Sequence, residues 1–297
     1  MYDRFAFEQG GHFFCKKVGE NLNQNWIVEN LNNAFSTWNG KLGELWGLVT
    51  TGPQTFKGGA VWSVMQTLHN GMVGIGYALV VLFFAISLCK NTMNFHELKR
   101  PEAAIHYLIR FVAAKALVGY GMDIMLNVFS ICNGIVTDMA NSMGGISEAM
   151  VSLPAEMQTA IENVGFLASI PLWLITILGS LFITVLSFVM ILTVYGRFFR
   201  LYMYTALAPL PLAAFAGEST QSVGISFLKS YVGVCLEGAV IVLACVIYSA
   251  FVSTPTVISG EATTIVWSYL AETVFNMLVL VGLIKGSDRI IHEMMGL

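Results

Sequence analysis

Charge is scarce in this chain: Asp, Glu, Lys and Arg make up 11% of its 297 residues, against roughly 25% in a typical soluble domain. Its 15 Lys and Arg residues are absent from two long intervals, 116–196 and 231–284. The formal net charge of −3 excludes a strongly basic protein that binds nucleic acid through its phosphates. Long apolar runs fill both intervals, so the composition predicts a membrane protein.

Motifs for catalysis and metal binding are also missing. There is no nucleotide-binding GxxxxGK[ST], no GxSxG, and His96-Glu97 and His292-Glu293 lack the second His of a zinc protease motif. No two cysteines have CxxC spacing, which excludes the usual zinc and disulfide frameworks. The five are Cys15, Cys89, Cys132, Cys235 and Cys245. We expect no catalytic residue, no metal and no cofactor.

Residues 1–60 differ from the rest because they are polar and dotted with aromatics. Apolar residues recur within them at helical spacing and predict an amphipathic helix that ends at Gly52-Pro53. They are Trp26, Ile27, Leu31, Phe35, Trp38, Leu42, Leu45 and Trp46. Three tryptophans on one stripe suit a helix anchored at the membrane interface, and a helix packed on a partner subunit fits equally well.

Residues 61–297 predict an all-α transmembrane domain, with basic residues at alternate ends of its apolar runs. Lys99 and Arg100 follow the first run, and Arg197 and Arg200 mark a cytoplasmic boundary after the third. Because Lys and Arg stay on the cytoplasmic side, we expect the N-terminus outside and the C-terminus inside. The expected spans are 61–88, 116–135, 168–195, 230–252 and 265–284, with an outside loop at 136–167. One long helix starting at Pro101 is expected to contain the second span.

The apolar segment 201–216, LYMYTALAPLPLAAFA, is not counted as a span. Pro209 and Pro211 each remove a backbone donor and disfavour a straight helix. If this segment crossed the membrane, the Lys-free loop after the fourth span would fall on the cytoplasmic side. We therefore expect a re-entrant segment or a cytoplasmic elbow.

Five charged residues in or near the spans need an explanation. Asp123, Glu237 and Glu272 lie inside spans, and Lys115 and Lys229 lie near the cytoplasmic boundary. A charge in hydrocarbon costs at least ~2.5 kcal/mol, so these side chains should face water or a partner. The acids are candidates for a pore lining or proton path, or for polar contacts between helices. Lys115 could pair with Glu237, within or between subunits, or extend to the headgroups.

The order of these parts resembles the TrbL/VirB-type polytopic inner-membrane proteins of type IV secretion and conjugation systems. The likeness rests on the outside N-terminal region, the span order, the central loop and the segment RFFRLYMYTALAPLPLAAFA. The stretch ELKRPEAAIHYLIRFVAAKALVGYGMDIM is similar to versions in conjugative elements of Gram-positive bacteria.

The resemblance implies a channel or platform subunit of a DNA-transfer machine in the bacterial cytoplasmic membrane. It implies a homo-oligomeric ring, thought to be pentameric, surrounded by lipid, with ATPases on the cytoplasmic side and stalk or pilus components outside. Contact with DNA would be indirect. Two alternatives remain: a small-solute or ion transporter built around Pro209 and Pro211, and an assembly factor without a pore.

The predicted topology can be tested with accessibility tags fused at each end. An odd number of spans places the two tags on opposite sides of the membrane. Protease protection of the tags in spheroplasts measures this directly. Two tags on the same side would contradict the five-span topology.

Overall fold

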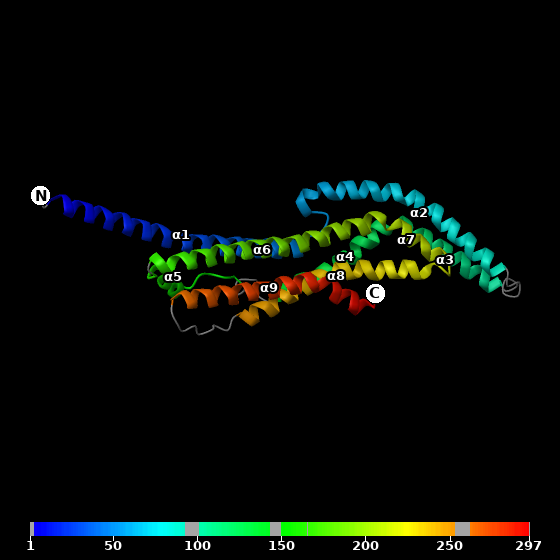
Figure 1. Cartoon of the computed structure of the whole chain (residues 1–297). Helices are drawn as coiled ribbons and strands as arrows, with labels where there is room; N and C mark the ends of the chain where they lie inside the picture. The colour runs from blue at the N-terminus through cyan, green and yellow to red at the C-terminus, as the bar shows by residue number, and fades with distance from the viewer. Residues whose placement is uncertain (1–2, 93–100, 143–149, 165, 253–261, 297) are drawn as a thin grey trace. The chain divides into compact units, whose positions relative to one another are not determined.

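The computed structural model describes residues 3–92, 101–142, 150–164, 166–252 and 262–296, and regular structure in these ranges is helical (Figure 1). The fold class predicted from composition is therefore confirmed. The helices are α1 (Asp3–Thr50), η1 (Phe56–Gly59), α2 (Ala60–Thr92), α3 (Pro101–Gly119), α4 (Gly121–Ser142), α5 (Ala155–Glu162), α6 (Phe166–Leu207), α7 (Pro209–Ala213), η3 (Ala214–Ala216), α8 (Gln221–Val252) and α9 (Ala262–Met295).

Several of these helices have the length and hydropathy of membrane spans. Four qualify alone, namely Phe56–Lys90, Ile170–Leu207, Gln221–Val252 and Thr264–Met295. The bent pair Ile105–Gly119 and Gly121–Asn141 adds a fifth span if the two helices together count as one. The chain is thus a multi-pass helical membrane protein. The orientation of its termini stays a prediction.

The chain divides into two compact units. The first comprises residues 1–46, 145–192 and 244–284, and the second comprises 47–144, 193–243 and 285–297. Helices α1, α6, α8 and α9 contribute residues to both.

In the first unit, the apolar stripe of α1 is covered by the same chain. Phe35 packs edge-on against Tyr269 of α9, with ring centroids 6.4 Å apart. Asn30 donates to the Ser180 hydroxyl of α6 at 2.9 Å. Asn39 donates to the carbonyl of Val151 at 2.8 Å and accepts from its amide at 3.0 Å. Helix α1 therefore packs against other parts of the same chain, which was neither of the two surroundings predicted from the sequence.

The three tryptophans predicted as interfacial anchors therefore have different surroundings. Trp38 has no exposed surface, because it lies on the side of α1 that is buried within the protein. Its predicted place at the membrane interface is wrong within this fold. Trp26 is 42% exposed, and its ring is tilted against that of Trp173 with centroids 5.8 Å apart; Trp46 is half-buried. Only these two keep ring surface for an interface.

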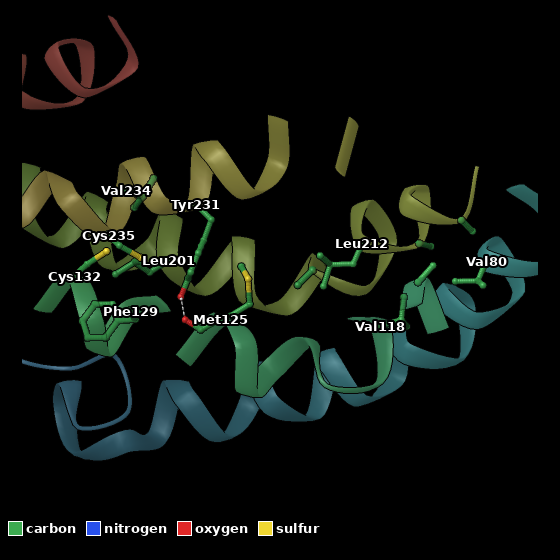
Figure 2. Close-up of a cluster of buried hydrophobic side chains, with 14 residues drawn as sticks. Val80, Val118, Met125, Phe129, Cys132, Leu201, Leu212, Tyr231, Val234 and Cys235 are labelled. Atoms are coloured by element: carbon green, nitrogen blue, oxygen red, sulfur yellow. Dashed lines mark hydrogen bonds between the residues drawn. The ribbon is translucent and has the colours of Figure 1, made fainter. Parts of the chain in front are cut away.

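The second unit has a core in which α4 packs with α6, α8 and the α7–η3 segment (Figure 2). Tyr231 of α8 lies in this core and donates to the Met125 carbonyl of α4 at 2.8 Å. Figure 2 shows Cys132 and Cys235 on facing helices beside Leu201. The core members are Val80, Ala114, Val118, Met125, Phe129, Cys132, Leu201, Ala208, Leu212, Ala213, Ala216, Tyr231, Val234 and Cys235.

The helix expected to run straight from Pro101 through 116–135 is broken, and that prediction was wrong. α3 and α4 meet at Tyr120 with a bend of 72°. Glycines on both sides allow neighbouring groups to come close at the bend: a Cβ on Gly119 would lie 2.7 Å from the Tyr77 hydroxyl, and one on Gly121 would lie 3.1 Å from Leu212. Glycine is a common cause of sharp helix kinks.

The proline-containing segment forms an elbow at the end of a longer helix than expected. α6 continues past the predicted limit of 195 to Leu207, and Pro209 then begins the short α7. Proline fits there because the first turn of a helix needs no backbone donor from it. α7 and η3 pack against both α2 and α3. The expected break is confirmed, and whether the elbow re-enters the membrane stays a prediction.

Two predicted loops lie wholly or mostly outside the described residues. These are the cytoplasmic loop carrying Lys99 and Arg100 and the loop after α8. The outside loop 136–167 is described in part, through the end of α4, the segment 150–154 and α5.

Close packing of α2 makes a prediction about two of its glycines. A Cβ on Gly76 would lie 2.9 Å from Val118 and 3.0 Å from Pro209, whereas one on Gly74 would meet nothing within 4 Å. We expect Gly76→Ala to lower the unfolding temperature, because α2 would have to move away from α3 and α7. Gly74→Ala should leave it unchanged or raise it, since alanine favours the helix by up to about 1 kcal/mol. Thermal unfolding in detergent measures both variants, and equal behaviour would contradict the packing.

Candidate functional site

The most polar feature of the second unit's interior is an arginine that lies against helix backbones. Arg197 of α6 is completely buried. Its Nε donates to the Val234 carbonyl at 3.2 Å and its Nη2 to the Cys235 carbonyl at 3.1 Å, both on α8. Nη1 lies 3.5 Å from the carbonyl of Val49, near the end of α1. That carbonyl lies in the last turn of α1, where carbonyls have no partner within the helix.

A glycine on α8 makes room for this guanidinium. A Cβ built on Gly238 would lie 2.7 to 2.8 Å from three atoms of the Arg197 guanidinium. A side chain at this position would displace Arg197 from the α8 backbone. Gly238 is therefore required for close contact between α6 and α8.

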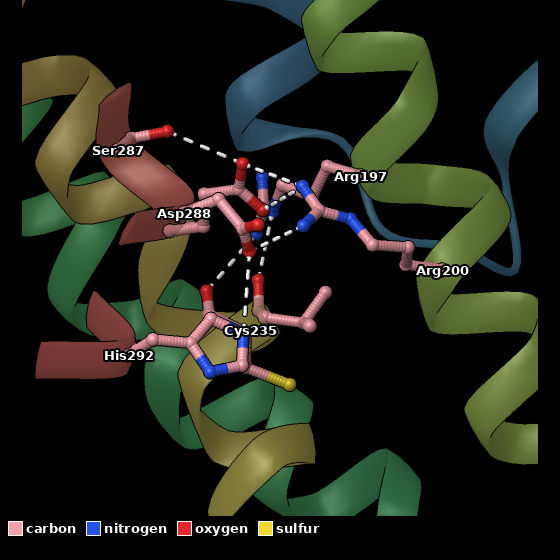
Figure 3. A network of polar contacts seen from close by, with 8 residues as sticks. Arg197, Arg200, Cys235, Ser287, Asp288 and His292 are labelled. Carbon is pink, nitrogen blue, oxygen red and sulfur yellow. Dashed lines mark hydrogen bonds and ion pairs between the residues drawn. The ribbon is translucent and has the colours of Figure 1, made fainter. Parts of the chain in front are cut away.

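The adjacent residue, Glu237, has a buried carboxylate with several donors (Figure 3). Nη2 of Arg200 lies 2.7 Å from each of its oxygens, and the Ser287 hydroxyl donates to Oε1 at 3.2 Å. Arg200 also contacts Asp288 of α9 through Nη1. His292 lies 3.6 Å from Asp288 and adds charge only when protonated. Figure 3 shows both arginines reaching from α6 toward α8 and α9.

The cluster balances its own charge. Two arginines stand against Glu237 and Asp288, and Glu237 is 1% exposed while Arg200 is 28% exposed. An isolated ion in such surroundings would cost several kcal/mol, so removal of either partner leaves an uncompensated charge. The arrangement fixes α6, α8 and α9 against one another. Chemically it is a charge-neutral clamp.

Of the two alternatives for Lys115, the pairing with Glu237 does not form within the chain. Lys115 is exposed on α3, and Arg200 occupies the carboxylate instead. Arg197 and Arg200 stay predicted at the cytoplasmic boundary, and the structure adds that both point inward at polar groups. A planar guanidinium suits buried carboxylates and carbonyls better than an ammonium does.

The other predicted residues lie apart from this cluster. Asp123 is exposed on α4, and Lys229 is exposed on α8. Pro209 is buried in the elbow, with Pro211 half-buried beside it. Glu272 belongs to the first unit, where it lines a pocket of about 600 Å³ with Tyr248, Tyr269 and Asn276. The structure thus brings only Glu237, of the five charged candidates, into the cluster.

Sequence reasoning missed the cluster although a signal for it was present. The spans contain acids without an obvious base, and Arg197 and Arg200 follow one apolar run with a helical spacing of three. Such spacing puts two side chains on one helix face. Glu237 is followed at once by a glycine, which marks a close approach of another element.

The described residues offer no metal-binding group: no three His, Cys, Asp or Glu side chains in those ranges could hold an ion together. The cluster itself holds two guanidinium groups, which repel metal ions.

The helices and the buried charge cluster define the class of this molecule, a multi-pass helical membrane protein. A family model described as TrbL/VirB6 plasmid conjugal transfer like protein matches residues 38–209, more than half of the chain. The chain belongs to this family, whose members are structural components of type IV secretion and conjugation systems. No curated protein matches the chain, and no solved structure matches it.

The ion pair predicts that mutations of Arg200 and of Lys115 have different effects on stability. Arg200→Met should destabilise the protein by about 3–5 kcal/mol, because it leaves the buried Glu237 without its main partner. Adding Glu237→Gln to that variant should recover part of the loss by removing the stranded charge. Lys115→Met serves as the control and should have little effect.

Unfolding temperatures of the four proteins in one detergent provide the comparison. A loss in Lys115→Met as large as that in Arg200→Met would refute the assignment of Arg200 as the partner. No recovery in the double variant would show that the lost packing, and not the charge, matters.

Proposed function

We propose that this protein is a channel or platform subunit of a conjugative type IV secretion machine in the bacterial cytoplasmic membrane. The observation that carries the proposal is the family match over residues 38–209. It covers the end of α1, all of α2 to α6 and the first residue of α7, and so includes Arg197 and Arg200. The proposal includes a homo-oligomeric ring, with five copies by family resemblance.

Exposed apolar surface supports assembly in a bilayer. Large apolar side chains are exposed along α2, α3 and α6, including Val81, Leu108 and Leu192 at 57%, 59% and 63%. Exposing so large an apolar area to water is unfavourable, so lipid or neighbouring copies would cover it. In this arrangement ATPases dock on the cytoplasmic side and stalk or pilus components outside, while DNA passes without being read by this chain.

The buried clamp suits a platform better than an enzyme. Its charges contact one another and backbone carbonyls, which fixes helices without presenting a reactive group. A rigid subunit of this kind can transmit load between a cytoplasmic motor and an external stalk. We assign it no chemical step.

Assembly and transfer are the two measurements that test this function. We expect the native mass in mild detergent to be a multiple of 32.5 kDa and particle images along the membrane normal to show a closed ring. Deleting the gene from its element should abolish transfer of marked DNA, and the wild-type gene should restore it. Arg200→Met should fail to restore transfer, whereas Lys115→Met should succeed.

A stable monomer in both detergent and lipid would overturn the ring. Undiminished DNA transfer by the deletion strain would overturn the role in conjugation and would favour a transporter.

A further inference from the structure

Helix α4 has one buried side and one exposed side, and the exposed side is unusual for a helix of a membrane protein. One side is buried, through Met125, Phe129, Cys132, Val136 and Ala140, and the first three belong to the core of the second unit. These residues follow one another at three- and four-residue steps, so they form a single face. The same face holds the contacts to Tyr231 and Cys235 of α8.

The opposite side of α4 is polar along its whole length. Asp123, Asn127, Ser130, Asp138 and Asn141 are all exposed. At 100° per residue, they centre roughly 150° around the helix from the buried face. A polar face with two acids is therefore turned away from the protein core.

A narrow apolar flank lies beside that polar face. Ile131 is 69% exposed and Ile135 is 46% exposed. Ile131 directly follows Ser130, so one helix presents a side chain suited to lipid next to one suited to water. An Asp in hydrocarbon costs about 2.5–3.5 kcal/mol, which makes lipid an unfavourable cover for the polar side.

A hollow of about 530 Å³ adjoins the polar face. It is lined by the turn Gly52–Gln54 together with Asp123, Asn127, Ser130 and Asn133. Liquid water takes about 30 Å³ per molecule, so the hollow has room for several. The turn is non-helical backbone, which is tolerated among membrane helices where protein or water covers it.

Asn133, which lines the hollow, joins α4 to the end of α1. The Asn133 amide nitrogen donates to the Thr50 carbonyl at 3.3 Å, near the end of α1. Its Oδ1 is buried and has no hydrogen-bond partner in the described part of the chain. A buried amide oxygen without a partner costs about 1–3 kcal/mol.

We propose that the polar face of α4, from Asp123 to Asn141, lines a water-filled passage of the assembled protein, with Ile131 and Ile135 turned to lipid. This rests on the proposed function, because the passage runs between copies in a ring. The passage would take hydrated, polar cargo, and the two acids would favour cations over anions among small ions. This assigns α4 to the wall of the lumen.

Spin labels at neighbouring positions test this directly in the full chain. Cys15 and Cys89 are replaced by serine, while Cys132, Cys235 and Cys245 are buried and stay. Single cysteines at Ser130 and Asn127 probe the polar face, and cysteines at Ile131 and Ile135 probe the flank. Collision rates with a water-soluble nickel complex and with oxygen are then measured in proteoliposomes.

A lined passage predicts nickel collision several-fold higher at 130 than at 131, with the reverse order for oxygen. It also predicts that the labels at 131 and 135 report depths well inside the hydrocarbon. Wet labels at 130 with shallow flank labels would overturn the proposal, because α4 would then lie on the membrane surface. Deep flank labels with dry, immobile labels at 127 and 130 would also overturn it, since a protein partner would then cover the face.

The two proposals fail separately. The same labelled proteins are weighed and imaged for rings. A closed ring with dry labels at 130 would overturn the passage and leave the platform function standing. A monomer would overturn the ring and, with it, a passage between copies, whatever the labels report.

Discussion

The second unit depends on neutralising charge inside an apolar protein. Nη2 of Arg200 contacts both carboxylate oxygens of Glu237, and Arg197 donates to carbonyls of two other helices. Between helices in a bilayer there is little hydrophobic driving force, so polar contacts and close packing carry more of the specificity. The cluster therefore sets the register of α6 against α8 and α9, and the core around Tyr231 follows from that register.

Glycine makes these contacts sterically possible. Gly238 lets the Arg197 guanidinium lie on α8, Gly76 lets α2 approach the elbow, and Gly121 lets Leu212 reach the bend. In each case a single Cβ would occupy space that another side chain or backbone needs. The glycines that meet nothing, such as Gly74 and Gly134, do not have this role. Packing, and not glycine content, distinguishes the two groups.

The irregular segments lie where the helices would otherwise be continuous. The turn after α1 is held by the Tyr202 hydroxyl, which donates to the Pro53 carbonyl at 2.8 Å. The elbow at Pro209 is buried against α2 and α3. Both satisfy the rule that non-helical backbone among membrane helices needs protein or water around it. The turn also adjoins the polar face of α4, which connects this constraint to the proposed passage.

The sequence by itself determined the class of fold, because apolar runs without Lys or Arg have few alternatives to membrane helices. It also placed the end of α1 and the break at Pro209, since glycine and proline act locally on the backbone. Tertiary structure decided which charges meet. Arg200 is 37 residues from Glu237 and 88 from Asp288, and helix periodicity alone cannot choose among distant partners. The bend at Tyr120 and the burial of Trp38 were likewise decided by neighbours, because each depends on which helix packs across from it.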